Sequence, residues 1–172
     1  MSHCFLAALA AIPILTVKLS AQTPFQFPTA NHALFEPGKE LIFFAPTSPD
    51  RPWMTGSFGC VRTDGWQMHE GLDIRSLQHD RSGEPTDPVM ATADGTVMYF
   101  SSKAGLSNYG KYIVIRHVIE GVDIYSLYAH LSEIASGLAV GKAVRGGDVI
   151  AIMGRTSNTS ERIGKELSLI HI

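Results

Sequence analysis

The two longest apolar segments of this chain are separated by a short turn. Residues 111–118 and 122–131 are rich in isoleucine, valine and tyrosine, and Glu120-Gly121 lies between them. Segments of this composition that flank a glycine-containing turn predict an antiparallel β-hairpin. The strongest pattern in the chain therefore favours an antiparallel sheet.

The remaining apolar segments are shorter and also read as strands. Asp94-Gly95 lies between two of them, which predicts a second hairpin. Two glycines within residues 53–62 suit a strand with a bulge or a close approach of another backbone. No segment has helical periodicity over the length of a major helix, and residues 132–138 could make a single turn. We predict an all-β fold built from antiparallel hairpins, with strands at 41–44, 53–62, 89–92, 96–100 and 149–153 and a surface loop at 75–88.

Composition limits the size and the partners of the domain. With 172 residues, of which 45% are hydrophobic, the chain can form one domain with a substantial core. The formal net charge is −2, and lysine and arginine do not cluster. Nothing in the sequence therefore indicates a nucleic acid or an anionic membrane as a partner.

The first 50 residues are expected to lie outside the main domain. Residues 4–17 form an apolar run of about 14 residues, too short for the roughly 20 that span a bilayer. The run resembles a secretory signal, although Met1-Ser2-His3 has no lysine or arginine, and a buried terminal helix is the alternative. We predict a signal peptide over residues 1–21 and hence an exported protein, periplasmic or extracellular. Removal of the signal peptide would leave Cys60 as the single cysteine, so no internal disulfide is expected.

Residues 22–50 are rich in proline but also contain several phenylalanines. Disordered segments are poor in aromatic residues. We therefore expect an irregular arm that packs on the domain, which would comprise residues 51–172.

The segment His69-Glu70-Gly71-Leu72-Asp73 carries the clearest chemical signal. Imidazole nitrogen and carboxylate oxygen are zinc ligands at about 2.0–2.2 Å. In a straight strand, residues four apart are separated by roughly 13 Å, so a shared metal requires a bend. Gly71 is the residue that permits such a bend.

The other histidines differ in their surroundings. His130 ends an apolar strand, at the rim of the predicted sheet, where a rigid scaffold can hold a catalytic group. His117 lies within an apolar strand, which favours a structural role, and His79 lies in the polar loop, where exposure to solvent is expected. His32 belongs to the arm.

A series of short motifs occurs in a fixed order from residue 53 to residue 156. The motifs are Ser57-Phe58-Gly59 with Arg62, His69-Glu70-Gly71-Leu72-Asp73, Ala93-Asp94-Gly95-Thr96-Val97, Tyr109-Gly110 with His117, Leu127-Tyr128-Ala129-His130, Gly147-Asp148 and Met153-Gly154-Arg155-Thr156. The series resembles the lysostaphin-type (LytM-like) zinc metallopeptidases, built on the duplicated hybrid motif, which cut peptide bonds in bacterial peptidoglycan. The resemblance implies a β-sheet domain with a groove over a bound Zn²⁺.

The resemblance also implies roles for individual residues. His69 and Asp73 match two zinc ligands, and His130 matches a histidine that lines the site and positions water or stabilises the oxyanion. In the family the third ligand is the second histidine of a His-x-His pair, whose first histidine is the candidate general base. This chain has no such pair. Leu169 falls at the first position and His171 at the ligand position.

The last six residues, Leu-Ser-Leu-Ile-His-Ile, match one reading frame of a common transposase sequencing adapter. We therefore hypothesise that residues 167–172 are adapter-derived and that the natural chain continues differently after Glu166. His171 would then resemble a ligand by coincidence.

The expected function is that of an exported zinc metalloendopeptidase, acting as a monomer on the peptide cross-links of peptidoglycan. The chain as given is expected to be impaired, because the His-x-His pair is missing and the last core strand is truncated. One alternative is a non-catalytic LytM-like domain that binds the cell wall or regulates an amidase. A lipoyl- or biotinyl-carrier-like domain is the other, because Gly147-Asp148-Val149-Ile150 resembles its hairpins. That reading needs a lysine at a hairpin tip, and neither Asp94-Gly95 nor Glu120-Gly121 supplies one.

Overall fold

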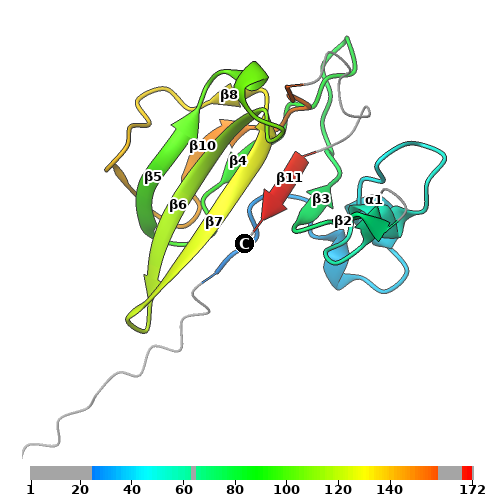
Figure 1. The fold of residues 1–172 in the computed structure, drawn as a ribbon, viewed down its shortest axis with the longest axis horizontal. Helices are drawn as coiled ribbons and strands as arrows, with labels where there is room; N and C mark the ends of the chain where they lie inside the picture. The colour runs from blue at the N-terminus through cyan, green and yellow to red at the C-terminus, as the bar shows by residue number, and fades with distance from the viewer. Residues whose placement is uncertain (1–24, 63–64, 159–167, 172) are drawn as a thin grey trace, which may run out of the picture.

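The computed structural model describes residues 25–62, 65–158 and 168–171, the last four by their backbone alone (Figure 1). Its described strands form two larger antiparallel sheets and one two-stranded ribbon. Buried residues of both larger sheets belong to one hydrophobic core, including Ile113 and Ile115 from one and Val89 and Ile150 from the other. The predicted all-β fold is confirmed.

The larger sheet has six strands in the order β3-β11-β7-β6-β5-β9. Its centre is the hairpin of β6 and β7, which turns at Glu120-Gly121 and pairs Ile119 with Val122 at its tip. The hairpin predicted from composition and turn chemistry is therefore confirmed. The strands are β3 (Leu72–Ile74), β5 (Gly95–Ser101), β6 (Lys111–Ile119), β7 (Val122–Leu131), β9 (Ala143–Val144) and β11 (Ser168–His171).

The smaller sheet has the order β4-β10-β8, with β4 (Pro88–Met90), β8 (Glu133–Ile134) and β10 (Val149–Ile152). The hairpin predicted around Asp94-Gly95 is wrong, because β4 pairs with β10 whereas β5 pairs with β6 and β9. The carbonyl of Asp94 accepts a hydrogen bond from His117 Nδ1 at 2.9 Å, and its Oδ1 accepts one from the Gly146 amide at 2.8 Å. The turn thus connects the two sheets. The helical turn considered at residues 132–138 is also wrong, since β8 lies there.

The arm packs on the domain, as predicted. Phe43 and Phe44 are buried in the core, and Phe27 packs against it. The strand predicted at residues 41–44 is wrong: η1 (Ala33–Phe35) is followed by the single helical turn α1 (Glu40–Phe43), and only Phe44 forms a β-bridge, to Ile74. The helical turn closes with a 2.8 Å bond from Phe44 N to the Glu40 carbonyl.

Residues 53–62 do not form the single strand that was predicted. They comprise the 3₁₀ turn η2 (Trp53–Gly56) and β1 (Val61–Arg62), which pairs with β2 (Gln67–Met68). A Cβ added at Gly56 would collide with the Ala45 carbonyl, so the close backbone approach expected from a glycine does occur here.

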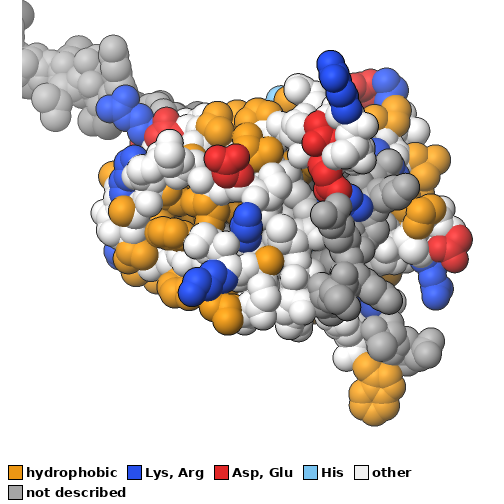
Figure 2. Space-filling view, turned by 90° about the horizontal axis from the view of Figure 1, so that it is seen from above, with side chains coloured by type: hydrophobic (Ala, Val, Ile, Leu, Met, Phe, Trp, Pro, Cys, Tyr) orange, Lys and Arg blue, Asp and Glu red, His pale blue; other side chains and the backbone are white. Residues whose placement is uncertain are grey.

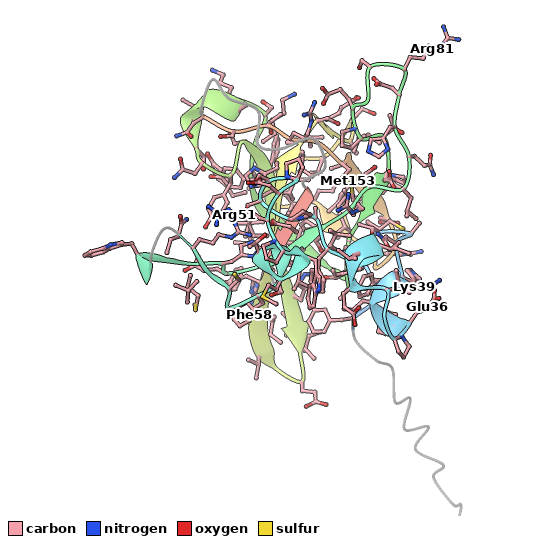
Figure 3. The ribbon with its side chains drawn as sticks, turned by 90° about the vertical axis from the view of Figure 1, so that its right-hand side faces the viewer. Glu36, Lys39, Arg51, Phe58, Arg81 and Met153 are labelled. Carbon is pink, nitrogen blue, oxygen red and sulfur yellow. The ribbon has the colours of Figure 1, made fainter. Side chains whose placement is uncertain are left out.

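The connection between β3 and β4 is a surface loop, as predicted. Its tip carries Arg81, whose side chain extends away from the rest of the molecule (Figure 3). The loop is anchored at its base, because buried Asp87 accepts hydrogen bonds from the Leu77 and Gln78 amides at 2.9 and 2.8 Å. η4 (Ala104–Leu106) is the corresponding short turn between β5 and β6.

His117 belongs to a buried polar network. Its Nε2 lies 2.8 Å from Ser126 Oγ, which donates to the Tyr128 hydroxyl at 3.0 Å, and that hydroxyl contacts Thr92. All four residues are buried. This network joins β6 and β7 to Thr92 in the connection between β4 and β5, which confirms a structural position for His117.

Charged side chains of both signs lie on one face of the molecule (Figure 2). On the face seen in Figure 2, lysine, arginine, aspartate and glutamate side chains are interspersed without a large cluster of one sign. Within the described part of the chain, no helix is long and apolar enough to cross a membrane. The predicted signal segment and its cleavage site lie outside the described residues.

Candidate metal centre

His69 and Asp73 come together as the bend hypothesis requires. The chain bends at Gly71, between β2 and β3, and places His69 Nε2 only 3.3 Å from Asp73 Oδ1. Both residues are buried, with 5% and 2% of their surface exposed. Two ligands of a tetrahedral ion at about 2.0–2.2 Å lie about 3.3–3.6 Å apart. The separation and the chemistry of this pair therefore fit a shared zinc ion.

The imidazole of His69 is held in one orientation. Its Nδ1 lies 2.9 Å from the Ser57 carbonyl, which can only accept, so Nδ1 carries the proton and Nε2 presents its lone pair towards Asp73. Backbone bonds on both sides of the ring, His69 N to Cys60 O and Gly59 N to His69 O, are each 2.8 Å long. This tautomer is the one in which a histidine binds a metal through Nε2.

Arg62 fixes the carboxylate of Asp73, a role that the sequence did not reveal. Its Nη2 donates to Asp73 Oδ2 at 2.7 Å, and its Nε donates to the Thr55 carbonyl at 3.0 Å. Nη2 also contacts the Thr55 carbonyl. Because Oδ2 is bound to the guanidinium, Oδ1 is the oxygen that faces His69. Arg62 was visible in the sequence only as a motif residue.

His130 lies within electrostatic range of Asp73, His69 and Arg62. Its Nδ1 donates to the Thr156 carbonyl at 2.7 Å, which leaves Nε2 as the acceptor. Burial lowers the pKa of His130, and the electrostatic effects of His69 and Arg62 lower it further, against the opposing effects of the Thr156 carbonyl and Asp73. The ring is therefore neutral near pH 7, as a proton acceptor must be.

The backbone around His130 is unusual. His130 has φ +58°, a left-handed conformation that few residues other than glycine adopt. Its amide donates to the Tyr109 carbonyl at 2.8 Å, and its carbonyl accepts from the Thr156 amide at 3.2 Å. A Cβ added at Gly154 would lie 2.7 Å from the His130 carbonyl oxygen, so only glycine allows this approach. These bonds hold the ring at the end of β7.

The segment that contacts His130 is itself tied to the surface loop. Arg155 Nε donates to Glu84 Oε2 at 3.0 Å, and a second bond joins Arg155 Nη2 to Glu84 Oε1. Thr156 Oγ1 donates to the Leu131 carbonyl at 2.8 Å. The position of the Thr156 carbonyl is therefore set from both sides.

The backbone of β11 places the last two candidates beside the pair. Leu169 lies opposite both Asp73 in β3 and Ala129 in β7, and His171 lies opposite Leu127. The side chains of Leu169 and His171 lie outside the described part of the structure. Among the side chains that are described, no third histidine, cysteine, aspartate or glutamate completes a metal site.

The family model of peptidase family M23 matches residues 67–169, which is more than half of the chain. The chain belongs to peptidase family M23. The matched segment begins in β2 and contains His69, Asp73 and His130. The resemblance noted from the motifs is thus confirmed.

Several relatives share this M23 domain. The chain is 39% identical over 95 residues to the DD-carboxypeptidase/endopeptidase Mpg of Neisseria meningitidis, covering 55% of the chain and 18% of that protein. It is 34% identical over 99 residues to the murein hydrolase activator NlpD of Salmonella typhimurium, covering 58% of the chain and 22% of that protein. The M23 chain thus spans less than a quarter of the length of these relatives.

Solved structures resemble it more distantly. The catalytic domain of lysostaphin from Staphylococcus simulans matches with a TM-score of 0.44 and 22% identity, covering 67% of this chain and 72% of that one. A zinc-containing peptidase from Vibrio cholerae matches with a TM-score of 0.49 and 24% identity, covering 75% of this chain and 36% of that one.

Proposed function

We propose that this chain is an exported zinc metalloendopeptidase that hydrolyses peptide bonds in bacterial peptidoglycan. The observation that carries the proposal is the pair of His69 and Asp73, buried, 3.3 Å apart and oriented by partners on both sides. His171 would be the third ligand if its side chain follows the register of β11. Membership of a peptidase family and the name of the Neisseria relative support this reading.

Each residue of the candidate metal centre would have its own role in hydrolysis. Zinc bound here would polarise the scissile carbonyl and lower the pKa of a bound water. His69 and Asp73 supply one nitrogen and one oxygen ligand, and Arg62 orients the carboxylate. His130, neutral and with Nε2 available, accepts a proton or stabilises the developing oxyanion. The proposed substrate is the peptide cross-link, and the proposed location is the periplasm or the cell exterior, on the strength of residues 4–17.

A regulatory role is the second candidate. Leu169 stands where the family has a histidine in the register that we propose, and leucine cannot transfer a proton. A relative named as a murein hydrolase activator gives this alternative a precedent. The chain would then bind the cell wall or activate an amidase without cutting peptide bonds itself.

One experiment separates the two functions. The protein is expressed from its source gene, read beyond Glu166, and compared with its His69→Ala variant for zinc content and for release of peptides from purified peptidoglycan. Chelator-sensitive cleavage that His69→Ala abolishes supports the endopeptidase. Absence of cleavage by zinc-loaded protein, together with stimulation of an added amidase, supports the regulatory role instead.

A further inference from the structure

Three tyrosines form a connected aromatic cluster beside the candidate metal centre. The rings of Tyr99 and Tyr112 lie 5.6 Å apart at an angle of 31°, and those of Tyr112 and Tyr109 lie 5.8 Å apart at 61°. Tyr99 is 51% exposed, and the other two are partly exposed. We call this cluster the tyrosine platform.

Strand register places the tyrosine platform on the same face of the six-stranded sheet as Asp73. Tyr99 lies opposite Val114, which lies opposite Leu127. Leu127 and Ala129 are two apart in β7 and share a face, and Ala129 is joined to Asp73 through the backbone of Leu169. Residues that lie opposite one another in a sheet have side chains on the same face. The face that holds the metal candidate therefore continues to Tyr99.

Tyr109, the member of the tyrosine platform nearest to the candidate metal centre, is hydrogen-bonded to His130. The Tyr109 carbonyl accepts the amide hydrogen of His130 at 2.8 Å. At the far end, four strand spacings of about 4.8 Å separate β3 from β5, which gives about 19 Å between Asp73 and Tyr99. An extended peptide covers that span with about five or six residues.

The chemistry of this face favours an uncharged amphipathic ligand. Ala129, Leu127 and Val114 lie between the metal candidate and Tyr99, and none of them carries a charge. Arg116 and Asp123 lie near the hairpin tip and pair with one another at 2.8 Å, and Lys111 of β6 donates its Nζ to the Ser132 carbonyl at 2.7 Å. Tyrosine combines an apolar ring face with a hydroxyl. A pyranose ring has the matching character, with an apolar face of C–H groups and polar substituents at its edge.

We propose that the tyrosine platform binds the glycan strand of peptidoglycan through its N-acetylhexosamine rings. This inference rests on the proposed function, because it is the short peptide joined to that glycan that would reach the metal centre. The platform would hold the sugar at the distance that the attached peptide spans. It thereby adds a carbohydrate site to a centre that acts on peptide.

The test measures binding of a tetramer of N-acetylglucosamine, and of glycan strands freed of peptide, by NMR titration of the whole protein. Loss of one ring should weaken binding about 2–10-fold, because the apolar face of the sugar loses its contact with the ring. Tyr99→Ala is therefore expected to bind several-fold more weakly, and Tyr99→Ala combined with Tyr112→Ala not measurably. Tyr99→Phe keeps the ring and should bind within about threefold of the original.

Tyr125→Ala is the matched control. Tyr125 is 48% exposed and lies on the same sheet, opposite Arg116 and towards the hairpin tip, so its loss should leave glycan binding unchanged. Glycan binding that survives in the double variant, or no glycan binding by the intact protein, overturns the platform.

A sugar-free cross-linked peptide separates the two proposals. Cleavage of that peptide without tyrosine-dependent glycan binding refutes the platform and leaves the endopeptidase intact. Tyrosine-dependent glycan binding by the protein read beyond Glu166, with cleavage of neither this peptide nor whole peptidoglycan, supports the platform and refutes the endopeptidase.

Discussion

Replacing Arg62 by methionine should weaken both the fold and the affinity for zinc. The change keeps the length of the side chain but removes the donors to Asp73 Oδ2 and to the Thr55 carbonyl. Breaking a buried ion pair by removing one partner typically costs about 3–5 kcal/mol. The side chain of Arg62 is 23% exposed, so water can partly replace it as a donor to Asp73. We therefore expect a loss of about 2 kcal/mol in the free energy of unfolding.

The effect on zinc follows from the orientation of the carboxylate. Without Arg62, Asp73 Oδ2 is no longer fixed, and both oxygens can rotate away from the geometry that faces His69. Loss of a group that orients a ligand typically lowers metal affinity about 10–100-fold. Arg62→Lys keeps the charge but replaces the planar guanidinium by a single ammonium donor. Its zinc affinity should therefore lie between that of the unmodified protein and that of Arg62→Met.

The assay is competition for zinc with a chromophoric chelator, together with urea unfolding of the metal-free protein. Arg51→Met is the matched control, since Arg51 is exposed and belongs to the segment just before η2 (Figure 3). It should leave both measurements unchanged. Zinc affinity of Arg62→Met equal to that of the unmodified protein would show that Asp73 does not depend on Arg62 for its role.

The remaining predictions concern the two histidines and the base position. His69→Ala and Asp73→Ala should each remove stoichiometric zinc by elemental analysis, and retention in both would exclude them as ligands. His130→Ala should keep zinc but lose about 10²–10³-fold in turnover on peptidoglycan, whereas loss of zinc would make His130 a ligand. Burial lowers the pKa of His130 below its ordinary 6.5, so the unfolded chain binds the extra proton first as the pH falls. Stability should therefore decrease from about pH 7 to about pH 5, and His130→Gln should reduce that decrease in urea unfolding; an identical decrease would refute it. Leu169→His supplies an imidazole at the proposed base position but leaves the other residues of 167–172 unchanged, so it should restore little cleavage to the chain as written, and full recovery would contradict this.

The sequence predicted correctly those structural features that depend on residues close together in the chain. The β6–β7 hairpin is such a case, because two β-rich segments and the turn between them specify it locally. The pairing of β4 was not predictable in this way, since Val89 pairs with Ala151 from a distant part of the chain. The arm shows the same limit, because Phe43 and Phe44 are apolar in either conformation and the contacts of the core select the helical turn.

The same distinction between local and long-range contacts applies to the candidate site. His69 and Asp73 are four residues apart, and Gly71 between them indicated the bend that brings them within 3.3 Å. The role of Arg62 depends on the fold, which brings it to Asp73 from another strand. Thr156 likewise meets His130 only through tertiary structure, although Gly154 in the same motif signalled a close approach there.

The left-handed backbone of His130 sets stability and activity against each other at a single position. A non-glycine residue in that conformation costs on the order of 1 kcal/mol. Glycine would relieve this cost but would also remove a buried side chain and its hydrogen bond to the Thr156 carbonyl. Asparagine adopts the left-handed conformation more readily than most residues and keeps a polar side chain, so libraries screened for heat resistance alone should accept asparagine at position 130 more readily than other replacements. Screens that also demand peptidoglycan cleavage should retain histidine despite its conformational cost. Position 130 thus offers a way to learn, from enrichment frequencies alone, whether catalysis has been under selection.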